Sequence, residues 1–469
     1  MNILADSSLK NNDSVFPLPL EPFEEYLLRD ESPYYSMTWG YEWYFEGQVE
    51  QNAFEQSFRE TLEHEPLLQA QIETRRGKFY WVPSPKPPEW IWNDYRGQTF
   101  ALADSGKMKI VRLDVQKSSA MRIEADRYDN ALVLRIYVHH SVADGIGVAC
   151  FAANWFSRYA NLLGDTDGVQ PFPPEKNRIK ERGQLHITLP EPVPFSQLMK
   201  SLLVEVIKWF WRRPFSLKRK QRSASQTSSL QDLTPIQCWQ SISPEMFAVY
   251  RAKAKSQNVS TNSLLLRDMF LFLRQWADEE QPESSAGKYF RILAPINMRN
   301  EFHKTIPAAN ILGYVFLDRA PQDCVADKKF LETIHQDMKH ILYWSIGTMF
   351  LDGVRFFQKI PFALRFLASQ RFCHSTTVLS NPGSFCLGLP QERFRNEKTI
   401  RVADLTLRQL VGAPPVRPHT PVAFGLISCA DQMTVTMNCE RSYFDSQQAE
   451  RFFDGFIEFL QQPSSMSDE

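Results

Sequence analysis

The chain has 469 residues and a formal net charge of −1, with 53 lysines and arginines against 54 aspartates and glutamates. This even balance argues against a nucleic-acid-binding protein, which usually carries a basic domain. At roughly 150 residues per domain the length predicts two or three domains, and the 34 phenylalanines and 11 tryptophans supply apolar volume for large cores or a cavity.

The cysteine content and the N-terminus both indicate a reducing compartment. The seven cysteines are odd in number and show no C-x-x-C spacing, which favours a cytoplasmic protein over a disulfide-bonded secreted one. The first residues have neither the charged nor the apolar region of a signal peptide. The sequence has no run of about 18 uncharged apolar residues, so we expect no transmembrane helix.

Helical and extended patterns alternate in the first part of the chain. Pro22 opens a short helix at 21–27, and Phe54, Phe58 and Leu62 recur at helical spacing within 51–64. Short strands are expected at 41–45, 78–82, 109–113 and 121–125. A longer strand then leads into a turn at 139–145, and a helix follows at 146–163.

The strand before this turn ends in two histidines. Its alternation places His140 at the end of an apolar row and His139 on the opposite face, beside Arg135. An imidazole at the end of a buried row needs a partner or a chemical role. A neutral imidazole can take a proton from a hydroxyl or amine, because its reference pKa of about 6.5 lies near working pH.

The turn itself carries one carboxylate and one glycine. Asp144 can cap the following helix, or it can hold the turn rigid by pairing with a distant arginine. Gly145 allows the backbone to turn tightly. The spacing His-His-x-x-x-Asp-Gly after an apolar strand is far more specific than a lone histidine.

Residues 164–235 differ in composition, with many prolines and a Ser/Gln-rich run at 223–231. Within them lies the apolar segment 202–213, followed by the basic residues 218–220. One interpretation is an amphipathic helix on an anionic membrane surface, which would make the protein membrane-associated through 202–220. The other, more ordinary interpretation is a linker helix that packs on the protein and leaves its basic end in solvent.

A second unit begins near Thr234. The run Ser260-Thr261-Asn262 can cap a helix over 263–276, and Pro361 is expected to divide the apolar residues 339–367 into two helices. Further strands are expected at 289–295 and 311–317, a strand and turn at 377–383, a hairpin from 422–428 and 433–439, and a final helix at 447–461 with Asp445 or Ser446 as its N-cap. Because both halves mix helices with strands, the fold class is α/β or mixed α+β.

Several known catalytic patterns are absent from the sequence. It has no G-x-S-x-G nucleophile elbow and no G-x-x-x-x-G-K-[ST] phosphate loop. The histidines do not cluster with carboxylates at metal-ligand spacing, so no metal site is expected. Gly145 and Gly147 follow a strand as in a dinucleotide-binding turn, but Cys150 stands in place of the third glycine.

The run 139–145, His-His-Ser-Val-Ala-Asp-Gly, resembles the His-His-x-x-x-Asp-Gly signature of the chloramphenicol acetyltransferase and condensation-domain superfamily. That group includes condensation domains of nonribosomal peptide synthesis, plant BAHD acyltransferases, wax ester synthases and polyketide-associated acyltransferases. Four other segments are similar to the group's patterns and occur in the same order. Residues 64–68, His-Glu-Pro-Leu-Leu, are similar to the pattern Arg-His-Pro-x-Leu-Arg, and 260–265, Ser-Thr-Asn-Ser-Leu-Leu, to Ser-x-Asn-Asp-x-Leu. Residues 295–299, Pro-Ile-Asn-Met-Arg, are similar to Pro-x-x-x-Arg, and 380–383, Ser-Asn-Pro-Gly, to Ser-Asn-x-Gly.

The resemblance covers most of the chain and implies its architecture. It implies two similar chloramphenicol acetyltransferase-like lobes arranged in a V, with an active-site tunnel between them. Residues 17–185 would form the N-terminal lobe that carries the motif, 186–234 a linker or crossover, and 235–465 the C-terminal lobe.

The resemblance also implies a role for each site residue. His140 matches the general base that deprotonates an acceptor hydroxyl or amine for attack on an acyl thioester. Asp144 matches a structural aspartate, and Arg299 is its expected partner. His139 and Gly145 complete the motif, and Asn297, Ser380 and Asn381 are candidate substrate-binding residues. The donor would be acyl-CoA or an acyl group on a carrier protein, and no other cofactor is expected.

Three functions are compatible with this pattern. The first is a stand-alone acyltransferase that forms an ester on a lipophilic substrate, which the apolar segments 202–211 and 339–367 favour. The second is a condensation enzyme that forms an amide from carrier-bound substrates. The third is a non-catalytic binding protein with the same fold, against which the intact motif argues. The sequence departs from the BAHD group because it has no Asp-Phe-Gly-Trp-Gly segment, with Phe424 and Gly425 as the nearest match. It shows no adenylation or carrier module, which favours a stand-alone enzyme over a peptide synthetase fragment.

Overall fold

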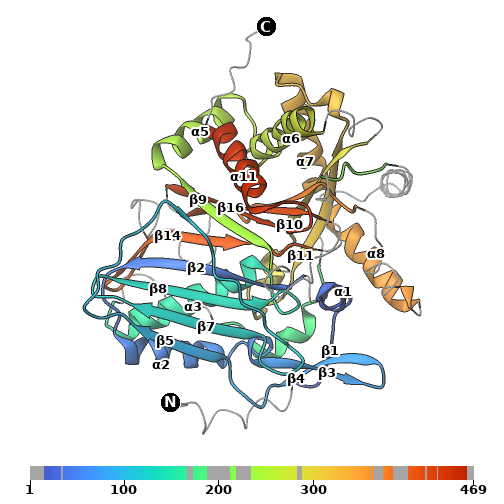
Figure 1. Cartoon of the computed structure of the whole chain (residues 1–469). Helices are drawn as coiled ribbons and strands as arrows, with labels where there is room; N and C mark the ends of the chain where they lie inside the picture. The colour runs from blue at the N-terminus through green and yellow to red at the C-terminus, as the bar shows by residue number, and fades with distance from the viewer. Residues whose placement is uncertain are drawn as a thin grey trace, which may run out of the picture.

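Two mixed sheets form the core of the computed structural model of this protein (Figure 1). The structure describes residues 15–32, 35–165, 173–186, 212–217, 234–281, 288–360, 362–363, 373–383, 400–417, 420–429 and 431–461. In the view of Figure 1 the helices α5, α6 and α11 lie above a seven-stranded sheet, and a six-stranded sheet lies below it.

The six-stranded sheet carries the histidine motif. Its order is β13 (Ile400–Val402), β14 (Leu405–Ala413), β2 (Thr38–Glu46), β8 (Ala131–His139), β7 (Met121–Arg127) and β5 (Glu89–Asp94), and only the β5–β7 pair is parallel. The helices α2 (Gln51–Leu62) and α3 (Gly145–Leu162) share a core with one face of this sheet. Aromatic side chains fill that core, with the rings of Phe54 and Trp155 4.6 Å apart.

The seven-stranded sheet belongs mainly to the second half of the chain. Its order is β11 (Leu312–Arg319), β10 (Phe290–Asn297), β12 (Thr377–Ser380), β15 (Val422–Cys429), β16 (Gln432–Cys439), β9 (Ile236–Ile242) and β6 (Ser105–Gly106). One face packs against α5 (Pro244–Ser256), α6 (Thr261–Glu280), α7 (Lys328–Tyr343) and α11 (Ser446–Gln461). The other face packs against α1 (Pro22–Asp30) and α8 (Gly347–Lys359).

Strands are exchanged between the two halves of the chain. β14 pairs with β2, so a late segment completes the sheet of the motif, and β6 pairs with β9 in the other sheet. The boundaries 17–185, 186–234 and 235–465 stay a prediction, but β14 falls in the last range and pairs with β2 of the first. A separate three-stranded sheet contains β1 (Leu18–Pro19), β4 (Lys78–Pro83) and β3 (Ala70–Arg75).

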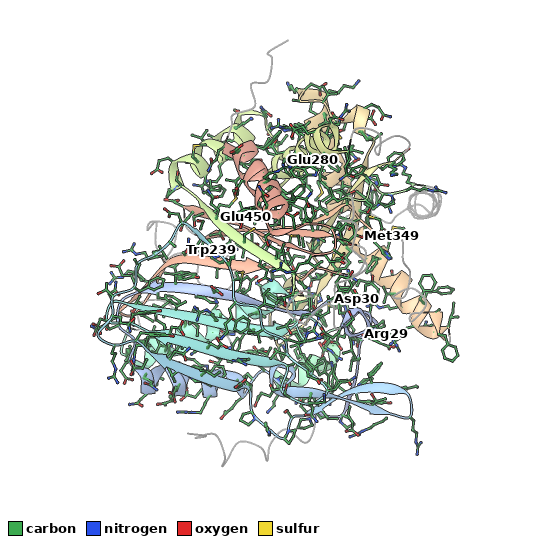
Figure 2. All side chains as sticks on the ribbon, in the orientation of Figure 1. Arg29, Asp30, Trp239, Glu280, Met349 and Glu450 are labelled. Atoms are coloured by element: carbon green, nitrogen blue, oxygen red, sulfur yellow. The ribbon has the colours of Figure 1, made fainter. Side chains whose placement is uncertain are left out.

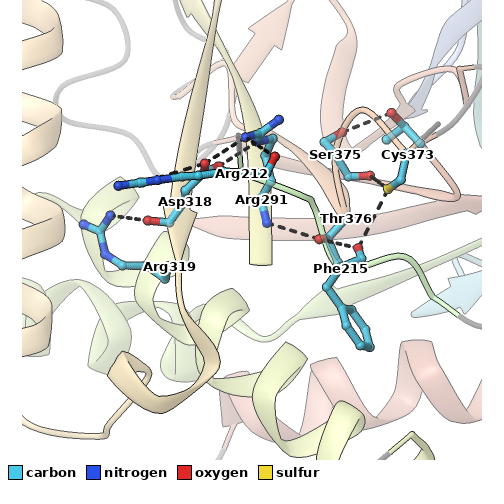
Figure 3. Close-up of polar contacts among 9 residues, drawn as sticks. Arg212, Phe215, Arg291, Asp318, Arg319, Cys373, Ser375 and Thr376 are labelled. Carbon is cyan, nitrogen blue, oxygen red and sulfur yellow. Dashed lines mark hydrogen bonds and ion pairs between the residues drawn. The ribbon is translucent and has the colours of Figure 1, made fainter. Parts of the chain in front are cut away.

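A buried ion pair joins the first two strands of the seven-stranded sheet. Arg291 of β10 lies directly opposite Asp318 of β11, and its guanidinium donates two hydrogen bonds of 2.7 and 2.8 Å to that carboxylate (Figure 3). Thr376 Oγ1 accepts from the main chain of Arg291 and donates to the carbonyl of Phe215 at 2.7 Å (Figure 3). These bonds fasten the described segment 212–217 to the sheet.

Most of the predicted elements are present. The strands expected at 41–45, 78–82, 121–125, 289–295 and 311–317 and the hairpin from 422 to 439 are all confirmed. Ser260 caps α6 by accepting from the N–H of Ser263 at 3.1 Å. Asp445, rather than Ser446, caps α11 by accepting from the N–H of Gln448 at 2.8 Å.

One element prediction is wrong, and another is only partly testable. Residues 109–113 form no strand, because the N–H groups of Lys109 and Leu113 donate to the side chains of Glu42 and Thr38 instead of to a neighbouring strand. One break in this stretch, between α7 and α8, falls at 344–346, where Ser345 has a φ of 50°. α8 then ends at Lys359, and Pro361 lies outside the described residues, so the division at Pro361 stays a prediction.

The segment 202–211 and the basic residues 218–220 lie outside the described residues, so both interpretations of them stay predictions. Within the described ranges, the helices are all too short or too polar to cross a bilayer.

Candidate active site

The two histidines lie where β8 ends, and both halves of the chain contact them. His139 is the last residue of β8, and His140 is the first residue of the turn. The N–H of His140 donates to the carbonyl of Met37 at 2.7 Å, and its carbonyl accepts from Nδ2 of Asn310 at 2.7 Å. The main chain of His140 is therefore held from both sides.

The side chain of His140 is half-buried, and its ring centroid lies 5.9 Å from that of Trp39. Burial lowers the pKa of His140 to about 4, opposed in part by its own main chain and by Asp144, while the positive charge of Arg417 lowers it further. The imidazole is therefore neutral at pH 7 and can accept a proton.

The burial of the two histidines differs from the sequence prediction. The apolar row on β8 is confirmed, since Leu134, Ile136 and Val138 have no exposed surface. However, His140 lies beyond the strand, and His139 is the histidine with no exposed surface. The reason is that the second face of β8 is also covered near its end, since Tyr137 and His139 on that face are both buried.

Asp144 fills both of the roles that the sequence left open. Its Oδ1 caps α3 by accepting from the N–H of Gly147 at 2.8 Å. Its Oδ2 accepts from Nη1 of Arg299 at 2.9 Å and from the N–H of Ile311 at 2.8 Å. The expected ion pair with Arg299 is thus present, and Nη2 of Arg299 also donates to the carbonyl of Ala309. One carboxylate fastens the turn to the second half of the chain.

Gly145 is needed for space and not for a tight turn. Its φ is not in the left-handed region, so the predicted reason was wrong. A Cβ atom at this position would lie 2.5 Å from Oη of Tyr41, which is a buried residue of β2. The next nearest atom of that ring, Cζ, would be 3.6 Å away, at ordinary contact distance.

We expect Gly145→Ala to destabilise the protein by about 1–3 kcal/mol, the usual cost of overpacking a core. In the double variant Gly145→Ala with Tyr41→Phe, most of this loss should be recovered because the clashing oxygen is removed. Urea unfolding of both variants, with Tyr41→Phe alone as the control, measures the effect. A double variant no more stable than Gly145→Ala would show that the Tyr41 hydroxyl is not the obstacle.

The candidate substrate-binding residues make contacts in the second half of the chain. Oδ1 of the exposed Asn297 accepts from the N–H of Arg299 at 3.1 Å, so it supports the Asp144 partner. Ser380 ends β12, and Nδ2 of Asn381 donates to Oδ1 of Asn262 at 3.1 Å. Substrate binding by these residues stays a prediction. In the described part of the chain, His, Cys, Asp and Glu side chains form no group of three that could hold a metal ion.

The segment 64–68 contributes a buried carboxyl group that joins the halves. Oε2 of Glu65 accepts from the N–H of Ala308 at 2.6 Å. Burial raises the pKa of Glu65 to about 8, partly offset by that hydrogen bond. The sequence resemblance singled out this segment but not this contact.

A buried cation that the sequence did not reveal also lies near the motif. Nε of Arg417 donates to Oδ2 of Asp30 at 2.8 Å, and its guanidinium lies 4.8 Å from the ring centroid of Tyr26. Asp30 ends α1 at the level where the two sheets meet (Figure 2). Only pairing between distant segments brings Arg417 here, so local patterns carry no signal for it.

No family model matches the sequence, and no curated protein matches it significantly. Solved structures do match over nearly the whole chain. The first condensation domain of the calcium-dependent antibiotic synthetase, in complex with a substrate analogue, has a TM-score of 0.67 at 14% identity and covers 96% of each chain. SgcC5 protein from Streptomyces globisporus has a TM-score of 0.64 at 13% identity, covering 94% of this chain and 98% of that one.

Polyketide synthase associated protein 5 from Mycobacterium tuberculosis has a TM-score of 0.59 at 15% identity, over 94% of this chain and 97% of that one. Together these neighbours show that the chain has the mixed α/β fold of condensation domains, as the motif predicted. The V shape and the tunnel stay predictions.

Proposed function

We propose that this protein is an acyltransferase that moves an acyl group from a thioester donor to a hydroxyl or amine, with His140 as the general base. The observation that carries the proposal is the environment of His140 in a condensation-domain fold. Its imidazole is neutral, and its main chain is hydrogen-bonded to residues of both halves of the chain. Asp144 and Arg299 would keep the turn in shape without touching the reacting atoms.

The reaction needs one proton acceptor and a thiol leaving group. His140 would take the proton from the acceptor hydroxyl or amine as its oxygen or nitrogen attacks the thioester carbonyl. The tetrahedral intermediate would collapse by breaking the carbon–sulfur bond, and the proton would pass from His140 to the sulfur. The products are an ester or amide and a free thiol.

Two donor classes fit this chemistry, acyl-CoA and an acyl group on a carrier protein. A structural neighbour, the starter condensation domain of rhizomide synthetase, was solved in complex with C8-CoA. For this chain we favour ester formation on a lipophilic acceptor in a cytoplasmic setting, and a peripheral membrane contact through 202–220 is the less ordinary of the two interpretations of that segment. Amide formation is the second candidate, because the same base serves an amine acceptor.

The function is tested by incubating purified protein with acyl-CoAs of several chain lengths and with alcohol or amine acceptors, and measuring free thiol. Thiol release that needs an acceptor and gives an acylated product would support acyl transfer, and the acceptor decides between ester and amide. Carrier-bound acyl donors form a second arm. Absence of acceptor-dependent release with both donor classes would favour the non-catalytic binding protein.

The pH profile should report the neutral base. Because the pKa of His140 is lowered to about 4, the ring stays neutral down to that pH. We expect kcat/KM to be flat above about pH 5 and to fall only as the pH approaches 4. The melting temperature at each pH is the control for acid unfolding. An acid limb near 6.5 would show that His140 has an ordinary pKa.

A further inference from the structure

A carboxylate at the end of α1 lies close to the first histidine of the pair. Glu31 follows the last residue of α1, and its Oε2 lies 3.6 Å from Nε2 of His139. The same oxygen accepts from the N–H of Met37 at 2.5 Å. The carbonyl of Met37 in turn accepts from the N–H of His140. The carboxylate of Glu31 therefore lies next to the ring of His139. It also accepts a hydrogen bond from Met37, the residue whose carbonyl accepts from the N–H of His140.

The hydrogen bonds of His139 favour one of its two neutral tautomers in the wild type. Its Nδ1 accepts from the N–H of Ser141 at 3.2 Å, and Oγ of Ser141 lies 2.6 Å away. A ring nitrogen that accepts has no proton, so neutral His139 carries its proton on Nε2. Nε2 is buried and has no hydrogen-bond partner among the described residues. The carboxylate of Glu31 is thus placed to attract this N–H.

We propose that Glu31 is a positioning residue for the histidine pair, an inference that rests on the proposed role of His140. Its negative charge holds His139 in the Nε2–H form, and its bond to Met37 sets the position of the His140 main chain. At an acyl-transfer site a shift of about 1 Å can cost about 100-fold in rate. Glu31 would therefore act on the rate without touching the substrate.

Arg112 provides a matched control for the charge of Glu31. Its Nε lies 3.5 Å from Oε1 of Glu31, and Nη2 donates to the carbonyl of Ser32 at 2.7 Å. The side chain of Arg112 is 43% exposed, and such surface pairs contribute little. Removing Arg112 should therefore leave the contact between Glu31 and His139 in place.

The kinetic test compares Glu31→Ala, Glu31→Gln and Arg112→Met by free-thiol release. We expect Glu31→Ala to lower kcat by about 10- to 100-fold with KM within about twofold of the wild type. Glu31→Gln keeps an acceptor for the N–H of Met37 but loses the charge, so its kcat should lie between those of the wild type and Glu31→Ala. The kcat of Arg112→Met should stay within about twofold of the wild type. Wild-type kcat in Glu31→Ala, or an equal loss in Arg112→Met, would overturn the proposal.

A spectroscopic test separates this proposal from the proposed function. Nitrogen chemical shifts of ¹⁵N-labelled histidines distinguish the two neutral tautomers, and the variant His139→Gln assigns the His139 signal. We expect the Nε2–H form in the wild type and a mixture of tautomers in Glu31→Ala and Glu31→Gln. Identical His139 shifts in wild type and both variants would refute the role of Glu31, even if no acyl transfer is found.

Discussion

Replacing His140 with alanine is expected to lower turnover by about 100-fold or more, the usual scale for loss of a positioned base. The fold should survive, because the bonds that His140 makes to Met37 and Asn310 are main-chain bonds that alanine keeps. The side chain gives up its contact with Trp39. Free-thiol release and the melting temperature, measured on the same preparation, separate the two effects.

The matched control for this experiment is His340→Ala, which removes an exposed histidine on α7. This variant should retain wild-type turnover and stability. Unchanged turnover in His140→Ala would remove His140 as the base. A large fall in melting temperature without loss of specific activity would give it a structural role instead.

Replacing Asp144 with alanine should instead cost both stability and activity. The change removes the cap of α3 and leaves Arg299 and the N–H of Ile311 without their carboxylate acceptor. Breaking one side of a buried ion pair costs about 3–5 kcal/mol, and loss of a cap costs about 1 kcal/mol more. Because the side chain of Arg299 is 15% exposed, we expect a total near the lower end of this sum, about 4 kcal/mol.

Urea unfolding and soluble yield measure this loss, with Asp144→Asn as the conservative comparison. Asparagine keeps an oxygen that can cap α3 but loses the charge opposite Arg299. The stability of Asp144→Asn should therefore lie between those of the wild type and Asp144→Ala. Wild-type stability in Asp144→Ala would mean that the pair with Arg299 does not fasten the turn. Activity should fall with stability here, whereas His140→Ala separates the two.

The sequence by itself determined the local elements around the site. The strand β8, the turn and the helix α3 follow from side-chain periodicity and from a cap residue, because those signals depend on neighbours a few positions away. The pairing of Asp144 with Arg299 was expected from the resemblance to the condensation-domain superfamily and is present at 2.9 Å. The condensation-domain fold was expected in the same way, and the solved structures show it.

Only the tertiary structure decided how distant segments meet at the motif. The need for Gly145 comes from the hydroxyl of Tyr41, and the burial of His139 comes from the cover on the second face of β8. Glu31, after α1, lies 3.6 Å from His139, and the charge of Arg417, in the loop after β14, lowers the pKa of His140. A strand's partner depends on the surface of a remote segment, which is why the pairing of β14 with β2 could not be read from either segment alone.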